Sequence, residues 1–160
     1  MKKFLPVLLL LFISYNGFAQ LEVGKSQNQL ESEKPKRIGA KMALLNPEYE
    51  LWAIDKDGQH TEYLRYEASG TNSYYDIKFS SMKEEKDFYE YVLGLFDNFK
   101  DNEILLKNYK LVPNKMSLVS KGNLFFDVYL FKNSSGHNES VMISKKAWIK
   151  LFKDSKINSL

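Results

Sequence analysis

The apolar residues of this chain recur with two different spacings, and this change of period restricts the fold more than any other feature of the sequence. The alternation of a half-buried strand runs through residues 49–54, 61–68 and 74–79. Asp57 and Gly58 separate the first two runs, and an Asp-Gly pair favours the tight turn of a β-hairpin. The sequence therefore predicts three consecutive strands, the first two of them joined as a hairpin.

The helical spacing of three and four residues occurs twice, each time after a serine that can cap a helix. Ser81 and Glu84 form a capping-box pattern, and an apolar stripe follows them as far as residue 99. Ser144 opens a second stripe that ends near residue 154. Two helices are predicted, at about 81–99 and 144–154.

Strand patterns return between the two predicted helices, at residues 104–112, 116–120, 124–131 and 141–143. Short turns join most of the strands, which argues against a doubly wound parallel sheet. The predicted fold class is α+β: a mainly antiparallel, curved sheet of six to eight strands with the two helices on one face.

The order strand, strand, strand, helix occurs twice along the chain. An offset of 64 residues places Gly58 on Gly122 and Phe88 on Phe152, and it matches apolar runs with apolar runs. Identities are few, and alternating strands resemble one another easily. An arrangement of two tandem βββα halves is therefore left open as an alternative.

The first 19 residues contain the three parts of a cleavable secretory signal peptide. Two lysines give the positive start, residues 4–13 form the apolar core, and Gly17 and Ala19 are the small residues before a cut ahead of Gln20. A membrane anchor is the alternative, but a spanning helix needs about 20 apolar residues and this run is shorter. We therefore expect export, to the periplasm or to the medium, with no stable membrane anchor after cleavage.

The remaining residues are predicted to form a leader and one domain. Residues 20–37 are polar and have too few apolar groups to offset the entropy of ordering, so we expect a flexible leader. Residues 38–160 have the length of a single α+β domain. The chain has no cysteine, which excludes a cysteine-linked lipid anchor, disulfides and thiolate zinc sites. An exported domain without disulfides is more typical of bacteria.

The charge balance argues against nucleic acid as a partner. Removal of residues 1–19 lowers the number of Lys and Arg residues from 23 to 21, against 20 Asp and Glu residues, so the net charge falls to +1. Nucleic-acid-binding domains usually carry a clear basic excess. The acids of the first predicted helix are expected to form a solvated face: Glu84, Glu85, Asp87 and Glu90.

Motifs that carry catalytic chemistry are scarce. The sequence has no glycine-rich phosphate loop, no G-x-S-x-G and no H-E-x-x-H, and no cofactor is predicted. A small extracytoplasmic hydrolase would have to use His60 or His137, which are the only histidines. Asp55, Asp57 and His60 are weak metal candidates, because acids at a hairpin tip more often bond to the local backbone. No metal site is predicted.

Aromatic residues give the strongest indication of a functional surface. Alternation places several aromatic and basic residues on the outer faces of strands, and both faces of the strand at 124–131 are apolar. Tyrosine and arginine favour interfaces because they combine contact area with hydrogen bonding. The predicted binding residues are Tyr63, Arg65, Tyr74, Phe125, Tyr129 and Phe131.

The sequence therefore predicts an exported, non-enzymatic binding or interaction protein whose partner is a protein or a glycan. The small hydrolase and a structural component of a cell-envelope assembly are the alternatives. The apolar second face at 124–131 is expected to be covered by the leader, a loop or the C-terminus. Burial against a partner or a second copy of the chain is the alternative, so an oligomer is left open.

Overall fold

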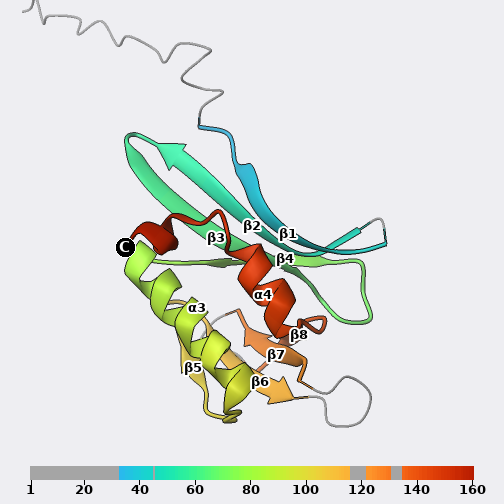
Figure 1. The fold of residues 1–160 in the computed structure, drawn as a ribbon. Helices are drawn as coiled ribbons and strands as arrows, with labels where there is room; N and C mark the ends of the chain where they lie inside the picture. Colours follow the sequence, from blue (N-terminus) through green and yellow to red (C-terminus); the bar gives the residue numbers. More distant parts are fainter. Residues whose placement is uncertain (1–32, 45, 116–121, 131–134) are drawn as a thin grey trace, which may run out of the picture. The chain divides into compact units, whose positions relative to one another are not determined.

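The computed structural model describes residues 33–44, 46–115, 122–130 and 135–160 (Figure 1). Internal contacts divide the chain into Met1–Glu31 and Ser32–Leu160, and the fold described below belongs to the second unit. None of the helices in the described ranges is both long enough and apolar enough to cross a membrane.

The first sheet has four antiparallel strands in the order β1-β2-β3-β4. Its strands are β1 (Lys36–Ala43), β2 (Asn46–Lys56), β3 (Gln59–Glu67) and β4 (Tyr74–Lys78). β1 begins at Lys36 and so takes up the last two residues of the predicted leader. The remainder of the leader as far as residue 32 lies outside the described residues.

The predicted hairpin joins β2 to β3. Asp57 and Gly58 both have positive φ, of 52° and 74°, and Lys56 pairs with Gln59 across the two-residue loop. This conformation suits the right-handed twist of the flanking strands, and glycine adopts it at little cost. The Asp-Gly pair therefore forms the turn that the sequence predicts.

The second sheet is also antiparallel, in the order β5-β6-β7-β8. Its strands are β5 (Ile104–Leu105), β6 (Lys110–Lys115), β7 (Leu124–Tyr129) and β8 (Asn138–Glu139). The run predicted as one strand at 104–112 is in fact two paired strands, because the chain turns back between Leu105 and Lys110. The predicted strand at 116–120 lies outside the described residues.

The expectation of a single sheet of six to eight strands is not confirmed. In the part of the chain that the structure describes, the strands form two sheets of four, and an isolated bridge between Ala68 and Ser140 links a residue next to β3 with one next to β8. The segment predicted as a strand at 141–143 contributes one further bridge, from Ile143 to Leu124. Each sheet is followed by a helix, so the α+β class is correct and the order of elements repeats as four strands and a helix.

Both predicted helices are present with their serine caps. α3 (Met82–Asp97) begins after Ser81, whose hydroxyl accepts from the Glu84 amide at 3.1 Å. Glu84 in turn accepts from the amide of Ser80, 2.6 Å away, rather than from that of Ser81. α4 (Lys145–Leu151) begins after Ser144, and a short 3-10 helix, η1 (Lys156–Ser159), ends the chain.

One core joins the two sheets and the two helices. The Trp148 ring of α4 is fully buried and lies 4.7–6.5 Å, centroid to centroid, from the aromatic rings around it: Phe88, Tyr89, Phe126 and Phe152. α4 packs against β1 and β2 on the face of the first sheet that carries Leu51 (Figure 1). The opposite face of that sheet is therefore turned away from this core.

Candidate binding face

The outer face of the first sheet carries a group of aromatic and charged side chains. Along β2 and β3, Leu51 and Leu64 point into the core, so alternation turns Trp52, Tyr63 and Arg65 to the other side. Antiparallel register places Trp52 opposite Tyr63, and Arg65 opposite Asp76 of β4. These four residues, together with Glu50 of β2, are called the outer-face cluster below.

The rings and the guanidinium group of the outer-face cluster are stacked. The Trp52 and Tyr63 rings are within 7° of parallel, with centroids 6.4 Å apart. The Arg65 guanidinium lies 5.5 Å from the Trp52 centroid and 5.8 Å from the Tyr63 centroid, within the range of a cation–π contact. Two rings and one cation therefore form a continuous contact across β2 and β3.

Carboxylates hold both ends of this stack. Arg65 donates to both oxygens of Asp76, at 2.8 and 3.2 Å, and this hydrogen bonding raises the pKa of Arg65. Glu50 accepts from the Trp52 indole at 3.1 Å and from Arg37 of β1 at 2.8 Å. The contact of Arg65 with Asp76 is bidentate, which fixes the plane of the guanidinium group.

A hollow of about 310 Å³ adjoins the cluster where β4 ends. The hollow is lined by residues of β2, β3 and β4 and by the residue that follows β4: Ile54, Thr61, Glu62, Tyr63, Asp76, Lys78 and Phe79. An aromatic ring, a carboxylate and an ammonium group thus border one concave surface. Pockets of this size hold small ligands or single side chains of a partner.

The structure brings together only part of the predicted binding set. Tyr63 and Arg65 belong to the outer-face cluster, although the Tyr63 side chain is largely covered by its neighbours and is 8% exposed. Tyr74 is 39% exposed at the first residue of β4. Phe125 and Tyr129 lie on β7 in the second sheet, and Phe131 lies outside the described residues.

Tyr129 has a separate set of partners. Its ring centroid lies 5.2 Å from that of His137 and 4.1 Å from the Lys110 ammonium nitrogen. His137 Nε2 is 3.6 Å from an Asp127 oxygen. Phe125, on the same face of β7, lines a different hollow of about 530 Å³. The predicted set therefore divides between two sheets.

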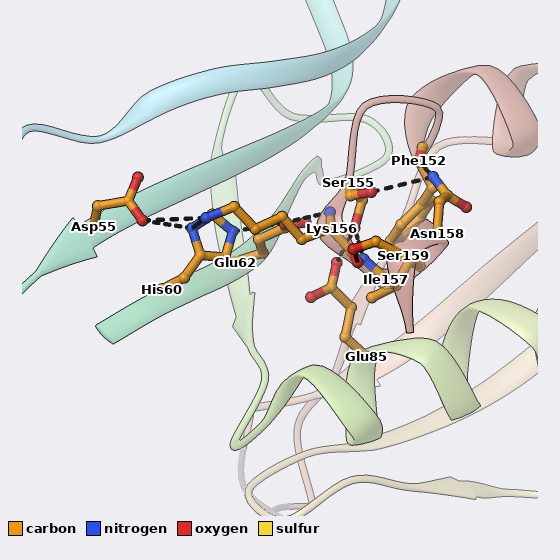
Figure 2. Close-up of polar contacts among 10 residues, drawn as sticks. All are labelled: Asp55, His60, Glu62, Glu85, Phe152, Ser155, Lys156, Ile157, Asn158 and Ser159. Carbon is orange, nitrogen blue, oxygen red and sulfur yellow. Dashed lines mark hydrogen bonds and ion pairs between the residues drawn. The ribbon is translucent and has the colours of Figure 1, made fainter. Parts of the chain in front are cut away.

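His60 lies between two carboxylates (Figure 2). Its Nδ1 is 2.7 Å from Asp55 Oδ1, and its Nε2 is 2.8 Å from Glu62 Oε1. Lys156 of η1 approaches the same ring, with its ammonium nitrogen 2.9 Å from Nδ1. In the part of the chain that the structure describes, no three acidic or histidine side chains are arranged to hold a metal ion.

Glu62 continues this chain of polar groups into the interior, where it meets Glu85 of α3 (Figure 2). The Glu85 side chain is fully buried, so its predicted place on a solvated helix face is wrong. It lies three residues before Phe88, on the same stripe as Val92 and Leu95. That spacing would have identified Glu85 as an inward-facing acid.

The two buried carboxyl groups have opposite pKa shifts. Burial raises the pKa of Glu85 to about 9, and the charge of Glu62 adds to this rise. Burial also acts to raise the pKa of Glu62, but hydrogen bonds from His60, the Lys156 amide and Ser155 outweigh it and lower the pKa. At neutral pH the pair therefore holds one proton, on Glu85, with Glu62 ionised.

The contacts of the two histidines do not form a nucleophile–base pair. Among the described residues, neither His60 nor His137 is hydrogen-bonded to a serine or threonine hydroxyl group. A serine hydrolase needs such a bond from the nucleophile to its base. Ser155, the hydroxyl nearest along this chain of contacts, lies 3.4 Å from Glu85 and donates to it.

Comparison with known proteins gives no relationship. No protein-family model matches the chain, and neither a curated protein nor a solved structure matches it.

Proposed function

We propose that this chain is an exported, non-enzymatic binding protein, periplasmic or secreted, that binds a protein or a glycan through the outer-face cluster. The observation that carries the proposal is the stack of Trp52, Tyr63 and Arg65 on the side of the first sheet opposite the core. The features of residues 1–19 support the export step.

The chemistry of the cluster suits either class of partner. Tryptophan, tyrosine and arginine are the residues that most often dominate the energy of protein interfaces. The C–H face of a sugar ring can also lie against an aromatic ring, while Asp76 and Lys78 of the adjoining hollow can hydrogen-bond hydroxyl groups. Two bonds to Asp76 hold Arg65 in place before a partner arrives, which lowers the entropy lost on binding.

Disruption of the stack is expected to weaken capture of the partner. Trp52→Ala should weaken binding at least tenfold, because truncation of a central aromatic at an interface typically costs about 2 kcal/mol or more. Arg65→Lys keeps the charge but loses the planar, two-pronged contact with Asp76, so it should weaken binding as well. Two measurements are made with the tagged protein: the recovery of envelope proteins crosslinked to it, and its binding to a glycan array.

The matched control is Tyr91→Ala, which removes an aromatic side chain that is 39% exposed on α3, away from the outer-face cluster. We expect Tyr91→Ala to recover the same partner as the unmodified protein. If Trp52→Ala and Arg65→Lys captured that partner as well as Tyr91→Ala does, while remaining folded by circular dichroism, the outer-face cluster would not be the binding surface.

A further inference from the structure

A second surface, made of residues other than those of the outer-face cluster, combines exposed apolar side chains with lysines. Met42 at the end of β1 is 49% exposed, and Leu44, which follows the strand, is fully exposed. Ile149 on the outer side of α4 is 46% exposed. Half of the large apolar side chains that are exposed in the described residues belong to β1, α4 and the segments beside them: Met42, Leu44, Met142 and Ile149.

Neither the backbone nor the side chain of Leu44 contributes to the stability of the fold. Leu44 has φ of 52°, in the left-handed region that non-glycine residues adopt at a cost. Its side chain gains no burial from the fold. Glycine or asparagine would occupy this position with less strain. A feature that costs stability and buries nothing in the isolated chain indicates a contact made with something else.

Lysines line a hollow beside Met42. A hollow of about 320 Å³ lies between β1 and α4, and three of its lining residues are lysines, Lys41, Lys146 and Lys150, while none is acidic. Lys41 is ion-paired with Glu48. Lys146 and Lys150 are exposed and have no ion pair among the described residues. Residues 144–154 carry four lysines and one acid, Asp154.

Met42 and Lys146 line this same hollow, so the end of β1 and α4 form one surface. On α4, the buried Trp148 and Leu151 face the core, and the helical period places Lys146, Ile149 and Lys150 together on the opposite side. Met42, Leu44, Lys146, Ile149 and Lys150 are called the basic-apolar patch below.

We propose that the basic-apolar patch binds the surface of an anionic lipid membrane. Leu44, Met42 and Ile149 enter the boundary between headgroups and acyl chains, while Lys146 and Lys150 contact lipid phosphates. This is reversible surface binding rather than an anchor, since a few side chains supply it. It uses residues separate from the outer-face cluster and does not depend on the proposed function.

The mixture of apolar and basic groups favours a membrane over other anionic partners. A soluble polyanion would satisfy Lys146 and Lys150 but would leave Leu44 and Ile149 in water. A membrane with an anionic surface above a hydrocarbon layer accommodates both kinds of side chain at once. A second copy of this patch would bring lysines against lysines, which opposes self-association through it.

Co-sedimentation with lipid vesicles tests this proposal. The protein is purified after export, with its first residue established by mass spectrometry. It is mixed at 0.1 M salt with vesicles of phosphatidylcholine alone, or of phosphatidylcholine with 30% phosphatidylglycerol. We expect binding to the anionic vesicles and at least tenfold weaker binding to the neutral ones, with the difference decreasing as salt is added.

Two variants separate the apolar and the basic contributions. Leu44→Asn should weaken vesicle binding roughly tenfold, because one inserted side chain is lost. The Leu44→Asn variant should fold like the unmodified protein, because asparagine adopts a positive φ more readily than leucine does. The double variant Lys146→Gln/Lys150→Gln should weaken binding roughly 25-fold, or about fivefold for each lysine near an anionic surface.

The matched controls alter the same residue types elsewhere: Leu105→Asn, on the exposed edge of the second sheet, and Lys100→Gln/Lys107→Gln. They should bind vesicles like the unmodified protein. The proposal is overturned by equal binding of patch variants and controls, by competition from glycerophosphoglycerol alone that removes all binding, or by a dimer in sedimentation equilibrium that Leu44→Asn dissociates.

Discussion

Replacement of Gly39 by alanine is expected to destabilise the domain by about 3 kcal/mol, because the main chain of α4 occupies the space that a Cβ atom would need. A Cβ built on Gly39 would overlap the carbonyl oxygen of Leu151 and would lie 2.9 Å from its carbonyl carbon. Both are backbone atoms at the end of α4, so no side-chain rotation can relieve the overlap. The helix would have to move away from β1.

Movement of α4 would disturb the centre of the core, which explains the size of the expected effect. Trp148, Leu151 and Phe152 are all buried and follow one another along this segment. A shift at Leu151 therefore opens gaps around the largest side chain of the core, and close-packed interiors tolerate such gaps poorly. Urea unfolding followed by tryptophan fluorescence measures the loss directly, since Trp148 reports on this core.

Gly94→Ala is the matched control for this substitution. Gly94 lies on the exposed side of α3, and a Cβ built there meets no atom within 4 Å. Alanine should therefore stabilise the helix by roughly 0.5–1 kcal/mol, since it loses less backbone entropy on folding than glycine does. Equal effects of Gly39→Ala and Gly94→Ala would mean that α4 does not pack closely on β1.

The elements that the sequence predicts correctly are those determined by neighbouring residues. Asp57 and Gly58 form a two-residue turn from their own conformational preferences, and Ser81 and Ser144 cap their helices with their own hydroxyl groups. Each of these structures needs contacts within about four residues. Their positions are therefore recognisable in one sequence without knowledge of the rest of the fold.

The division into two sheets depends on contacts between distant residues. Ser140 makes one bridge to Ala68, while its hydroxyl group accepts from Tyr49 at 2.8 Å and from the Phe126 amide at 2.9 Å. This single buried serine therefore joins groups from both sheets. In the sequence it stands in a polar stretch and looks like part of a loop, because its partners are 14 to 91 residues away.

The orientation of a candidate-site residue could be predicted where strand alternation alone determines the side of the sheet on which its side chain lies. Alternation correctly turns Tyr63 and Arg65 outward, and the same rule applied one position earlier turns Glu62 inward. Trp52 was missed, and Asp76 was not among the predicted binding residues, because their places opposite Tyr63 and Arg65 come from antiparallel register. The meeting of Glu62 with Glu85 follows from the packing of α3 on β3 and has no local signal.

Glu85→Gln is expected to make the domain several kcal/mol more stable at pH 8, which corresponds to a rise of roughly 10 °C in melting temperature. The pKa of Glu85 is about 9 in the folded chain, against an ordinary value of 4.5. The folded chain keeps a proton that the unfolded chain releases between these two values. Stability therefore falls as pH rises through this window, by about 1.4 kcal/mol per pH unit.

The glutamine variant removes this loss because it has no proton to release. Its amide group can still donate a hydrogen bond to Glu62, as the protonated Glu85 does. The two proteins should differ least near pH 4.5 and most near pH 9. Glu62 acts in the opposite direction, because its pKa is lowered: its contribution is present above about pH 4.5 and is lost as the pH falls.

Thermal unfolding from pH 4.5 to 9 tests this expectation, with Glu90→Gln as the control on the exposed side of the same helix. Glu90→Gln should keep the decline in stability with pH that the unmodified protein shows, whereas Glu85→Gln should flatten it.

If all three proteins lost stability at the same rate, Glu85 would already be ionised at neutral pH in the folded chain. Two carboxylates would then face each other in the interior, and Lys156 and His60 would have to compensate both charges. In that case Glu62→Gln should stabilise the domain, whereas with a single shared proton it should destabilise it, because Glu62 is the acceptor for the His60 ring and the Lys156 amide.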